Sequence, residues 1–497
     1  MNDWEHITKH AILGTERQPF SLPKTQSPLS SLWAQLETSE PAEKLLHSAA
    51  LLTEYRRLGW QPSTFEKPPL APSQAETLPQ CTPKAVELFR SILQENNSSI
   101  QSALLKEWLR LAQAAGQRVP FEILPVLLDK AKQDDTLQPY LTDTIGQRGH
   151  WLAKLNPDWQ DFLDTLPDVQ VSWETGSHAA RVAYLQQCRA TDPAQARELL
   201  AATWQQETVQ ARQAFLATFW VQLSLDDETF LENCFKDRSQ IVRQLAAQML
   251  GSFKSRFLKQ LLERLSTYFS VKTTLEINLP SEYDKQAWTR EGIKEKPPSS
   301  SKMGEKAWWL YQMLLSVRPS LLLAHFELPV ETYLKFLRKT DFANMLFDAL
   351  TVATQTHQDQ SVAAVLVQRS KRADVFLKTL TDMAEALPEN ERDTLLQTFL
   401  KTRKVFTNWS QVSQVVNLFP NGMSINLSQA LLTSLSRLLK KKNSNYYGYS
   451  DLLSLAAVLA PSCYEDMLQE NTEQHPATKN FIKIYHFRAQ MSQEFTQ

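Results

Sequence analysis

Two histidines near the start of the chain have the spacing of a metal-binding pair. His6 and His10 are four residues apart, which places both imidazoles on one face of a helix. A stable metal centre needs further ligands, and no HExxH motif or third ligand accompanies the pair. Packed or solvent-exposed histidines explain the same residues, so we expect no metal site and no cofactor.

Two pairs of neighbouring carboxylates could in principle share acid–base chemistry. Asp134-Asp135 and Asp226-Asp227 both fall at expected helix ends or loops, where a carboxylate caps backbone N–H groups. The sequence contains no GxxxxGK[ST], GxGxxG or GxSxG, the motifs that cradle phosphate or expose a nucleophilic serine. We therefore expect no catalytic residues. An unrecognised hydrolase, which would need polar groups to converge in one pocket, is our third interpretation.

A run of lysines is followed by tyrosines. Lys440, Lys441 and Lys442 precede NSNYYGY, and lysines beside aromatic rings can follow a nucleic-acid backbone while the rings stack on bases. The alternative is a solvated loop after a helix, whose C-terminal dipole favours cations. We favour the loop.

Three arginines recur at equal intervals. Arg181, Arg212 and Arg243 are spaced 31 residues apart, a period that indicates stacked helix pairs. In a regular stack they would line one ridge. Such arginines either pair with a carboxylate between repeats, as Asp237 and Arg243 could, or hold an acidic peptide or a phosphate. We favour the structural role.

The best-preserved copy of this repeat is FLENCFKDRSQIVRQLAAQMLG. Its apolar spacing predicts two short helices, the second capped by Asp237 with Gln240 as capping-box partner and ended by Gly251 in the left-handed conformation. An aspartate followed six residues later by an arginine resembles the second helix of a HEAT-type repeat. In the two earlier copies the aspartate position is Gln206 or Thr175.

Length and composition favour a helical protein. The chain has 497 residues, more than one core usually needs, so two or three packed regions or one continuous solenoid are expected. Only 11 glycines argue against a large βαβ enzyme. VKTTLEINL alternates apolar and polar residues, as a strand does. We predict an all-α, HEAT-like α-solenoid with one short strand or β-hairpin near 271–279.

We expect six regions along the chain. They are N-terminal helices (1–60), a proline-rich linker or surface strap (61–83), a helical region (84–176), HEAT-like repeats (177–270), a strand with a flexible charged loop (271–304) and a C-terminal helical region (305–497).

Charge and cysteine content give no sign of an unusual environment. The net charge is −1, which gives no global bias towards nucleic acid or anionic membranes. The cysteines form no CxxC pair, as expected of buried cytosolic thiols; they are Cys81, Cys188, Cys234 and Cys463. No secretory leader or long apolar run is evident, so we expect a cytoplasmic protein.

Several blocks together resemble an uncharacterised bacterial family, a domain of unknown function. The blocks are W-x6-A-x-LGT-x-R at the start, RGHWLAKLNPDW, RVAYLQQCRATDPAQARELL, FLENCFKDRSQIVRQLAAQML and AWWLYQML. The residues of the first two blocks that we take as its signature are Trp4, Gly14, Thr15, Arg17, Arg148, Gly149, Trp151 and Trp159. The family has no assigned catalytic residues, so none is carried over.

The resemblance implies a partner. Genes of such proteins lie beside those of MoxR-type AAA ATPases, von Willebrand factor A domain proteins and SWIM zinc-finger proteins. We therefore expect a non-enzymatic scaffold or adaptor that binds proteins, as an accessory subunit of a chaperone-like system. The alternative is a HEAT-like nucleic-acid-binding or DNA-repair protein, which would need a basic concave face and an acidic catalytic residue.

Overall fold

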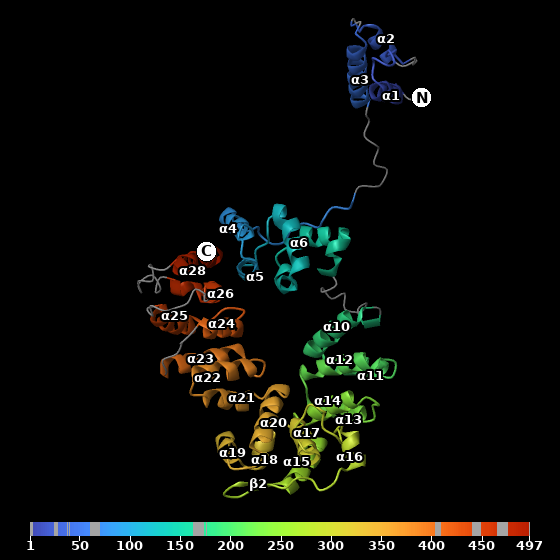
Figure 1. Cartoon of the computed structure of the whole chain (residues 1–497). Coiled ribbons are helices and arrows are strands. Elements are labelled where there is room, and N and C mark those ends of the chain that lie inside the picture. The colour runs from blue at the N-terminus through green and yellow to red at the C-terminus, as the bar shows by residue number, and fades with distance from the viewer. Residues whose placement is uncertain are drawn as a thin grey trace. The chain divides into compact units, whose positions relative to one another are not determined.

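The structure, a computed structural model, is almost entirely helical (Figure 1). It describes residues 3–23, 28–36, 38, 40–59, 70–162, 173–174, 176–402, 409–439, 449–464 and 476–496. Within these residues one two-stranded antiparallel sheet accompanies the helices, so the predicted all-α class is confirmed. The chain divides into two compact units, Met1–Pro72 and Ser73–Gln497.

The first unit is a small helical cluster with its own core. Its helices are α1 (Asp3–Leu13), α2 (Leu29–Ala34) and α3 (Pro41–Leu58). Trp33 of α2 is buried, and its indole Nε1 donates to the Ser48 carbonyl of α3 at 3.4 Å. Gly14 follows α1 with φ +82°, a conformation that glycine adopts without the steric cost of a side chain.

The second unit begins with a strap and a group of helices. The helices are α4 (Pro83–Leu93), α5 (Ser98–Ala114), η1 (Phe121–Ile123), α6 (Leu124–Gln133), η2 (Asp135–Leu137), α7 (Gln138–Leu141), α8 (Gly146–Leu155) and η3 (Pro157–Phe162). Asn97 separates α4 from α5 because its side chain accepts the backbone N–H groups of Ser99 and Ile100, as an N-cap does. Thr82 caps α4 in the same way.

Residues 73–82, at the end of the expected proline-rich linker, cross the surface of this group as an extended strap. Glu76 accepts the backbone N–H groups of Gln147 and Arg148 at 2.9 and 3.0 Å. Its carboxylate therefore caps α8, where the helix dipole favours negative charge. Gly146 has φ +64°, and a Cβ there would lie 2.4 Å from Glu76 Oε2. This glycine lets the carboxylate reach the helix end.

The next helices pack in neighbouring pairs (Figure 1). They are α10 (His178–Thr191), α11 (Pro193–Thr203), α12 (Val209–Ala217), η4 (Thr218–Trp220), η5 (Leu225–Asp227), α13 (Glu228–Cys234), α14 (Gln240–Leu250) and α15 (Arg256–Tyr268). α11 packs on α10 and α13 on α14, while α12 contacts both α10 and α14. The even-numbered helices thus follow one another in space.

The expected β-structure is a hairpin followed by a folded segment. β1 (Phe269–Val271) pairs with β2 (Leu275–Ile277), and residues 272–274 form the turn. The following segment, expected as a flexible charged loop, contains α16 (Lys285–Arg290). Trp288 of α16 is 3% exposed and packs against Tyr283 and Trp309, 5.3 and 5.6 Å between ring centroids. This aromatic cluster anchors a segment whose composition is mostly polar.

Helices continue to the end of the chain. They are α17 (Glu305–Leu315), α18 (Pro319–His325), α19 (Val330–Leu337), α20 (Ala343–Thr356), α21 (Gln360–Gln368), α22 (Ala373–Asp382), α23 (Glu389–Thr402), α24 (Trp409–Leu418), α25 (Ile425–Leu439), α26 (Tyr449–Ala456), η7 (Pro461–Cys463) and α28 (Pro476–Thr496). No helix among the described residues is long and apolar enough to cross a membrane.

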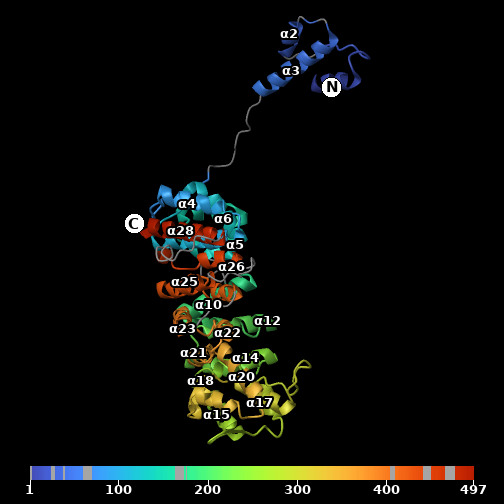
Figure 2. The same cartoon turned by 60° about the vertical axis from the view of Figure 1, so that its left-hand side comes forward.

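The last helix packs on the first helices of the same unit (Figure 2). α28 contacts α4 and α5, and Arg488 of α28 forms a buried ion pair with Glu107 of α5, 2.5 Å from Nε to Oε2. Phe495 meets Trp108 edge to face, with ring centroids 5.3 Å apart. The two ends of this long unit are therefore joined by both charge and apolar packing.

Two predicted features of the hairpin around α14 are wrong. Ser239, not Asp237, is the N-cap of α14, and Gln240 is the first helical residue, so no capping box forms. Gly251 ends the helix in a right-handed conformation at φ −80°. Glycine is needed there for space, because a Cβ would lie 1.7 Å from the Ser316 carbonyl oxygen.

Candidate functional site

Three arginines occupy the same position on three alternate helices, α10, α12 and α14. Each is the fourth residue of its helix, and its backbone N–H donates to the carbonyl of a hydroxyl-bearing N-cap residue, at 2.9, 2.9 and 3.2 Å in chain order. The N-cap and arginine pairs are Ser177 and Arg181 on α10, Thr208 and Arg212 on α12, and Ser239 and Arg243 on α14. The 31-residue interval thus marks structurally equivalent positions.

Glu207 joins the first two of these helices. Its carboxylate Oε1 lies 2.5 Å from Nη2 of Arg181, and its backbone carbonyl accepts a 2.7 Å hydrogen bond from Nη1 of Arg212. Burial raises the pKa of the Glu207 carboxyl, but the hydrogen bond and charge of Arg181 outweigh it, so the pKa is lower than usual. Glu207 therefore stays ionised at neutral pH and holds both arginines.

Asp237 repeats this arrangement one step along the chain. Its carboxylate Oδ2 lies 2.8 Å from Nε of Arg212, and its backbone carbonyl accepts a 2.5 Å hydrogen bond from Nη1 of Arg243. Arg243 also donates to the Thr289 carbonyl at 3.0 Å. The carboxylate of Asp237 thus pairs with the arginine of the preceding helix and not with Arg243. We call these contacts of Glu207 and Asp237 the arginine ladder.

Aromatic rings complete the surroundings of the ladder. The guanidinium of Arg181 lies over Trp173 and Phe215, 4.5 and 4.8 Å from the ring centroids, and that of Arg212 lies 5.8 Å from the Trp204 centroid. Cation–π attraction adds to the ion pairs in such positions. Each of the three arginines is therefore engaged by groups of the chain itself.

A hollow beside the ladder contains a cysteine but no reactive thiol. It has a volume of 650 Å³ and is lined in part by Trp204, Arg212, Phe230 and Cys234. Burial and, to a smaller extent, the nearby charge of Asp237 together raise the pKa of the Cys234 thiol to about 12, against the opposing charge of Arg212. The thiol is thus protonated at neutral pH and is a poor nucleophile. The hollow is a surface depression, and Cys234 does not provide it with an activated nucleophile.

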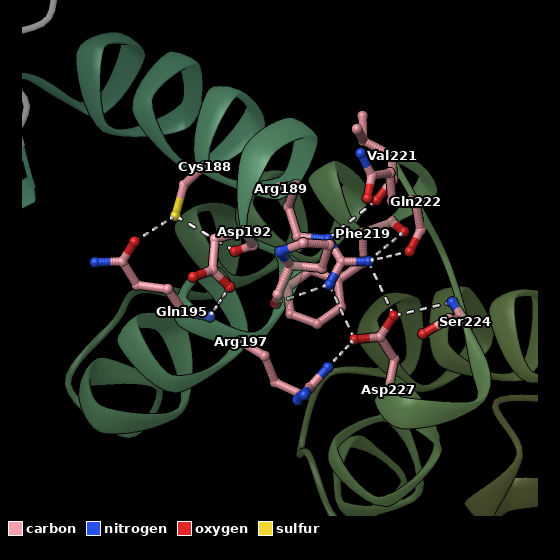
Figure 3. A network of polar contacts seen from close by, with 11 residues as sticks. Cys188, Arg189, Asp192, Gln195, Arg197, Phe219, Val221, Gln222, Ser224 and Asp227 are labelled. Atoms are coloured by element: carbon pink, nitrogen blue, oxygen red, sulfur yellow. Dashed lines mark hydrogen bonds and ion pairs between the residues drawn. The ribbon is translucent and has the colours of Figure 1, made fainter.

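A second arginine network lies in the interior next to the ladder (Figure 3). Arg189 of α10 and Asp227 of η5 are both 0% exposed, and each terminal nitrogen of the guanidinium lies 2.9 Å from one carboxylate oxygen. Arg197 binds the same carboxylate at 2.8 Å, and the Ser224 backbone N–H donates to it at 3.1 Å. Such a fully buried charge is tolerated only because its hydrogen-bonding capacity is filled.

The Arg189 guanidinium also holds the loop after η4 in place. It donates to the carbonyls of Phe219, Val221 and Gln222 at 3.4, 3.0 and 3.0 Å. Gln222 has φ +52°, which is unusual for a residue with a side chain. These contacts stabilise the turn that leads from α12 to α13, so the network positions the helices that carry the ladder.

The signature residues of the first unit lie around α1. Gly14 ends the helix, and the backbone N–H of Arg17 donates to the Gly14 carbonyl at 3.2 Å within the turn that contains Thr15. Trp4 is 39% exposed, with the guanidinium of Arg56 5.3 Å from its ring centroid. Gly14, Thr15 and Arg17 thus form the end of α1, and Trp4 contacts α3.

The signature residues of the second unit surround α8. Arg148 stacks its guanidinium 3.8 Å from the Phe121 ring centroid, and Trp159 donates from Nε1 to Asp129 at 2.9 Å. Gly149 is buried where an added Cβ would lie 2.4 Å from Cβ of Ile145. Trp151 is half-buried on the same helix. These contacts are structural in character.

The other candidate residues form no metal site in the described part of the chain. The His6 and His10 rings are 4.4 Å apart, but His6 contacts the Ser21 carbonyl and His10 contacts the His6 carbonyl. No group of three potential metal-ligating side chains occurs among the described residues. The four cysteines, all within the described residues, are buried and form no disulfide. Lys440 to Lys442, Tyr446 and Tyr447, with the side chain of Tyr449, lie outside what the structure describes.

The sequence of the chain matches one known family over nearly its whole length. The match is to the Family of unknown function (DUF5691) and covers residues 6–495. The chain belongs to this family. Comparison with curated proteins gave no match. The match spans both compact units of this DUF5691 protein, so it includes the small helical cluster as well as the ladder.

Proposed function

We propose that this DUF5691 protein is a non-enzymatic scaffold that binds other proteins along a HEAT-like α-solenoid. The observation that carries the proposal is the arginine ladder, in which Glu207 and Asp237 make the same two contacts to alternate helices. Repeated helix pairs joined by identical contacts build extended surfaces, and proteins of this kind use those surfaces for binding.

The proposed partners are a MoxR-type AAA ATPase and a von Willebrand factor A domain protein. The support is the gene neighbourhood of the family that the chain resembles. The buried Cys234 thiol has a raised pKa, and the carboxylates of Glu207 and Asp237 are paired with arginines. Both observations are consistent with an adaptor that carries out no reaction of its own. Such a protein would act in the cytoplasm with the ATPase.

The ladder weakens the alternative of a nucleic-acid-binding repeat protein. That alternative needs a row of available guanidinium groups to meet phosphates. Arg212 is only 5% exposed and pairs with Asp237, and Arg181 pairs with Glu207. Arg243 donates to two backbone carbonyls. Because these donors are engaged, the repeating arginines do not form a phosphate-binding row.

Affinity purification of the tagged full chain from native lysate, quantified by mass spectrometry, tests the proposal. We expect a stoichiometric protein partner, with the ATPase or the von Willebrand A protein among those recovered. Recovery of nucleic acid without any stoichiometric protein would contradict the scaffold and support the alternative.

A further inference from the structure

A groove of 1030 Å³ is bordered by α19, α20, α21 and α22. Phe347 of α20 and Val375 of α22 line it, and they are 47% and 45% exposed. Single exposed apolar residues are common on protein surfaces, but two that border one hollow offer an anchor for an apolar side chain of a partner.

The groove is rich in positive charge. Its lining includes five basic side chains and two acidic ones, Glu331 and Asp382. The basic residues are Lys335, Arg338, Arg369, Lys371 and Arg372. Arg372 pairs with Asp374, 2.7 Å from Nη2 to Oδ2, and Lys371 also has an interaction within the chain. Lys335, Arg338 and Arg369 still outnumber Glu331 and Asp382 in the remaining lining. A chain whose net charge is −1 therefore carries a local basic groove with apolar residues in it.

Arg338 and Arg369 are the centre of this charge. Among the described residues neither side chain has an ion pair with a carboxylate. Partial burial lowers the pKa of the Arg369 guanidinium below its usual value, and the positive charge of Arg338 lowers it further. Arg338 and Arg369 thus place two like charges near one another, and no carboxylate among the described residues forms an ion pair with either.

Helix dipoles explain only part of this arrangement. Arg338 and Arg369 are the C-cap residues of α19 and α21, positions where a cation is favourable. The dipoles do not explain why the C-terminal ends of the two helices lie close together. They also do not explain why Phe347 and Val375 are exposed beside these ends. An occupant that is both acidic and apolar satisfies both features together.

We propose that the groove binds an acidic, amphipathic segment of a partner protein, with its carboxylates at Arg338 and Arg369 and an apolar side chain against Phe347 and Val375. The inference rests on the proposed scaffold function and names the chemistry that the scaffold recognises. It is a form of helix-in-groove recognition, in which apolar anchors give affinity and charges give orientation.

Fluorescence anisotropy with a labelled peptide tests this on the full chain. The probe is a synthetic helical peptide with leucine at i, i+4 and i+7 and glutamate on the flanking positions. We expect saturable binding that weakens as salt rises from about 0.1 M to about 1 M, because the Debye length falls from about 10 Å to about 3 Å. Peptides with glutamine for glutamate, or with serine for leucine, are expected to bind at least about tenfold more weakly.

Variants of the chain locate the binding. Arg338→Glu with Arg369→Glu is expected to weaken peptide binding by about tenfold or more, because two attractions become repulsions. The matched control is Lys339→Glu with Lys378→Glu, two exposed lysines near the same helices that do not line the groove. This control makes the same change of net charge and is expected to leave binding within about twofold. Phe347→Ala should weaken binding roughly fivefold, whereas Ile241→Ala, an exposed apolar residue elsewhere, should not.

Several outcomes would overturn the inference. The glutamine peptide could bind as tightly as the glutamate peptide, or the groove variants and the control variants could lose the same affinity. The groove could instead bind single-stranded DNA more tightly than the acidic peptide, or the chain could self-associate in a way that the groove variants abolish. The proposed scaffold function is tested separately from the groove. If the wild-type chain recovers a stoichiometric partner and the groove variants recover it equally, the scaffold stands and the groove is not its docking site.

Discussion

Asp237 and Arg212 form an almost completely buried ion pair, with Oδ2 of the aspartate 2.8 Å from Nε of the arginine and side chains that are 4% and 5% exposed. The backbone carbonyl of Asp237 simultaneously binds Arg243 of the next equivalent helix. One residue thus connects α12 to α14 through both its side chain and its main chain, as Glu207 connects α10 to α12.

Removal of one partner of this pair should destabilise the second unit strongly. Asp237→Ala leaves Arg212 buried without its anion, so we expect the free energy of unfolding to fall by about 3 kcal/mol. Urea unfolding followed by far-ultraviolet circular dichroism measures the change. Arg256→Ala is the control, because Arg256 is 67% exposed in its pair with Glu232, and its loss should cost no more than about 0.5 kcal/mol. Equal losses in the two variants would show that the ladder is not a stabilising contact.

The Arg189 and Asp227 pair should be even less tolerant of a single substitution. Both side chains are 0% exposed, so Asp227→Ala leaves a buried guanidinium without charge compensation, at a cost of about 3 to 5 kcal/mol. Replacing both residues, with Arg189→Met added, removes the stranded charge and should recover part of the loss. Additive losses in this double-mutant cycle would contradict the ion pair as the reason for the effect.

Gly251 should be replaceable only at high cost. An alanine Cβ would lie 1.7 Å from the Ser316 carbonyl oxygen, so the end of α14 must move away from the end of α17. We expect Gly251→Ala to lower the free energy of unfolding by about 2 kcal/mol or more. Gly304→Ala is the control, since nothing lies within 4 Å of its added Cβ. Gly304 is the N-cap of α17, where alanine is less favourable than glycine, so we expect a loss of no more than about 0.5 kcal/mol. Thermal unfolding of both variants distinguishes these outcomes.

His357 should make stability depend on pH. Its Nε2 donates to the Leu315 carbonyl at 3.0 Å, and Nδ1 lies 2.6 Å from Ser252 Oγ. The pKa of His357 is lowered from 6.5 to about 4, mainly by burial and also by the charge of Arg318, against the opposing effects of the Leu315 carbonyl and Asp359. The folded state therefore resists protonation that the unfolded state accepts.

The sign of this dependence follows from proton uptake. Above pH 6.5 neither state is protonated at His357, and its contribution is complete. As pH falls from about 6.5 to about 4, the free energy of unfolding should drop by about 1.4 kcal/mol per pH unit from this residue. Urea unfolding of the wild type and of His357→Gln between these pH values provides the test. An unchanged slope in the variant would contradict the assignment.

Local patterns in the sequence predicted the equivalence of the three arginines but not their pairing. The interval between Arg181, Arg212 and Arg243 matches the interval between the N-caps Ser177, Thr208 and Ser239, although the helices that follow these N-caps differ in length. Glu207 was missed because it stands 30 residues before Asp237, whereas the arginines are 31 apart, so alignment on the arginines placed Gln206 at the acidic position. A search for an acidic residue just before each hydroxyl N-cap would have found it.

Contacts between distant residues left no local signal. Arg488 and Glu107 are 381 positions apart, and neither stands in a motif. Asp226-Asp227 was interpreted as a helix-end pair, and Asp227 does form a capping box with Ser224, but its burial against Arg189 depends on tertiary packing. The groove also escaped sequence analysis, because its lining residues come together only through the packing of α19, α20, α21 and α22.

The most direct test of the scaffold is quantitative affinity purification of the tagged full chain, comparing wild type with Arg338→Glu/Arg369→Glu and with the control Lys339→Glu/Lys378→Glu. We predict a stoichiometric protein partner on the wild type and the control, the MoxR-type ATPase or von Willebrand A protein among the recovered proteins, and its loss from the groove variant. Absence of any stoichiometric protein from the wild-type chain would contradict the account.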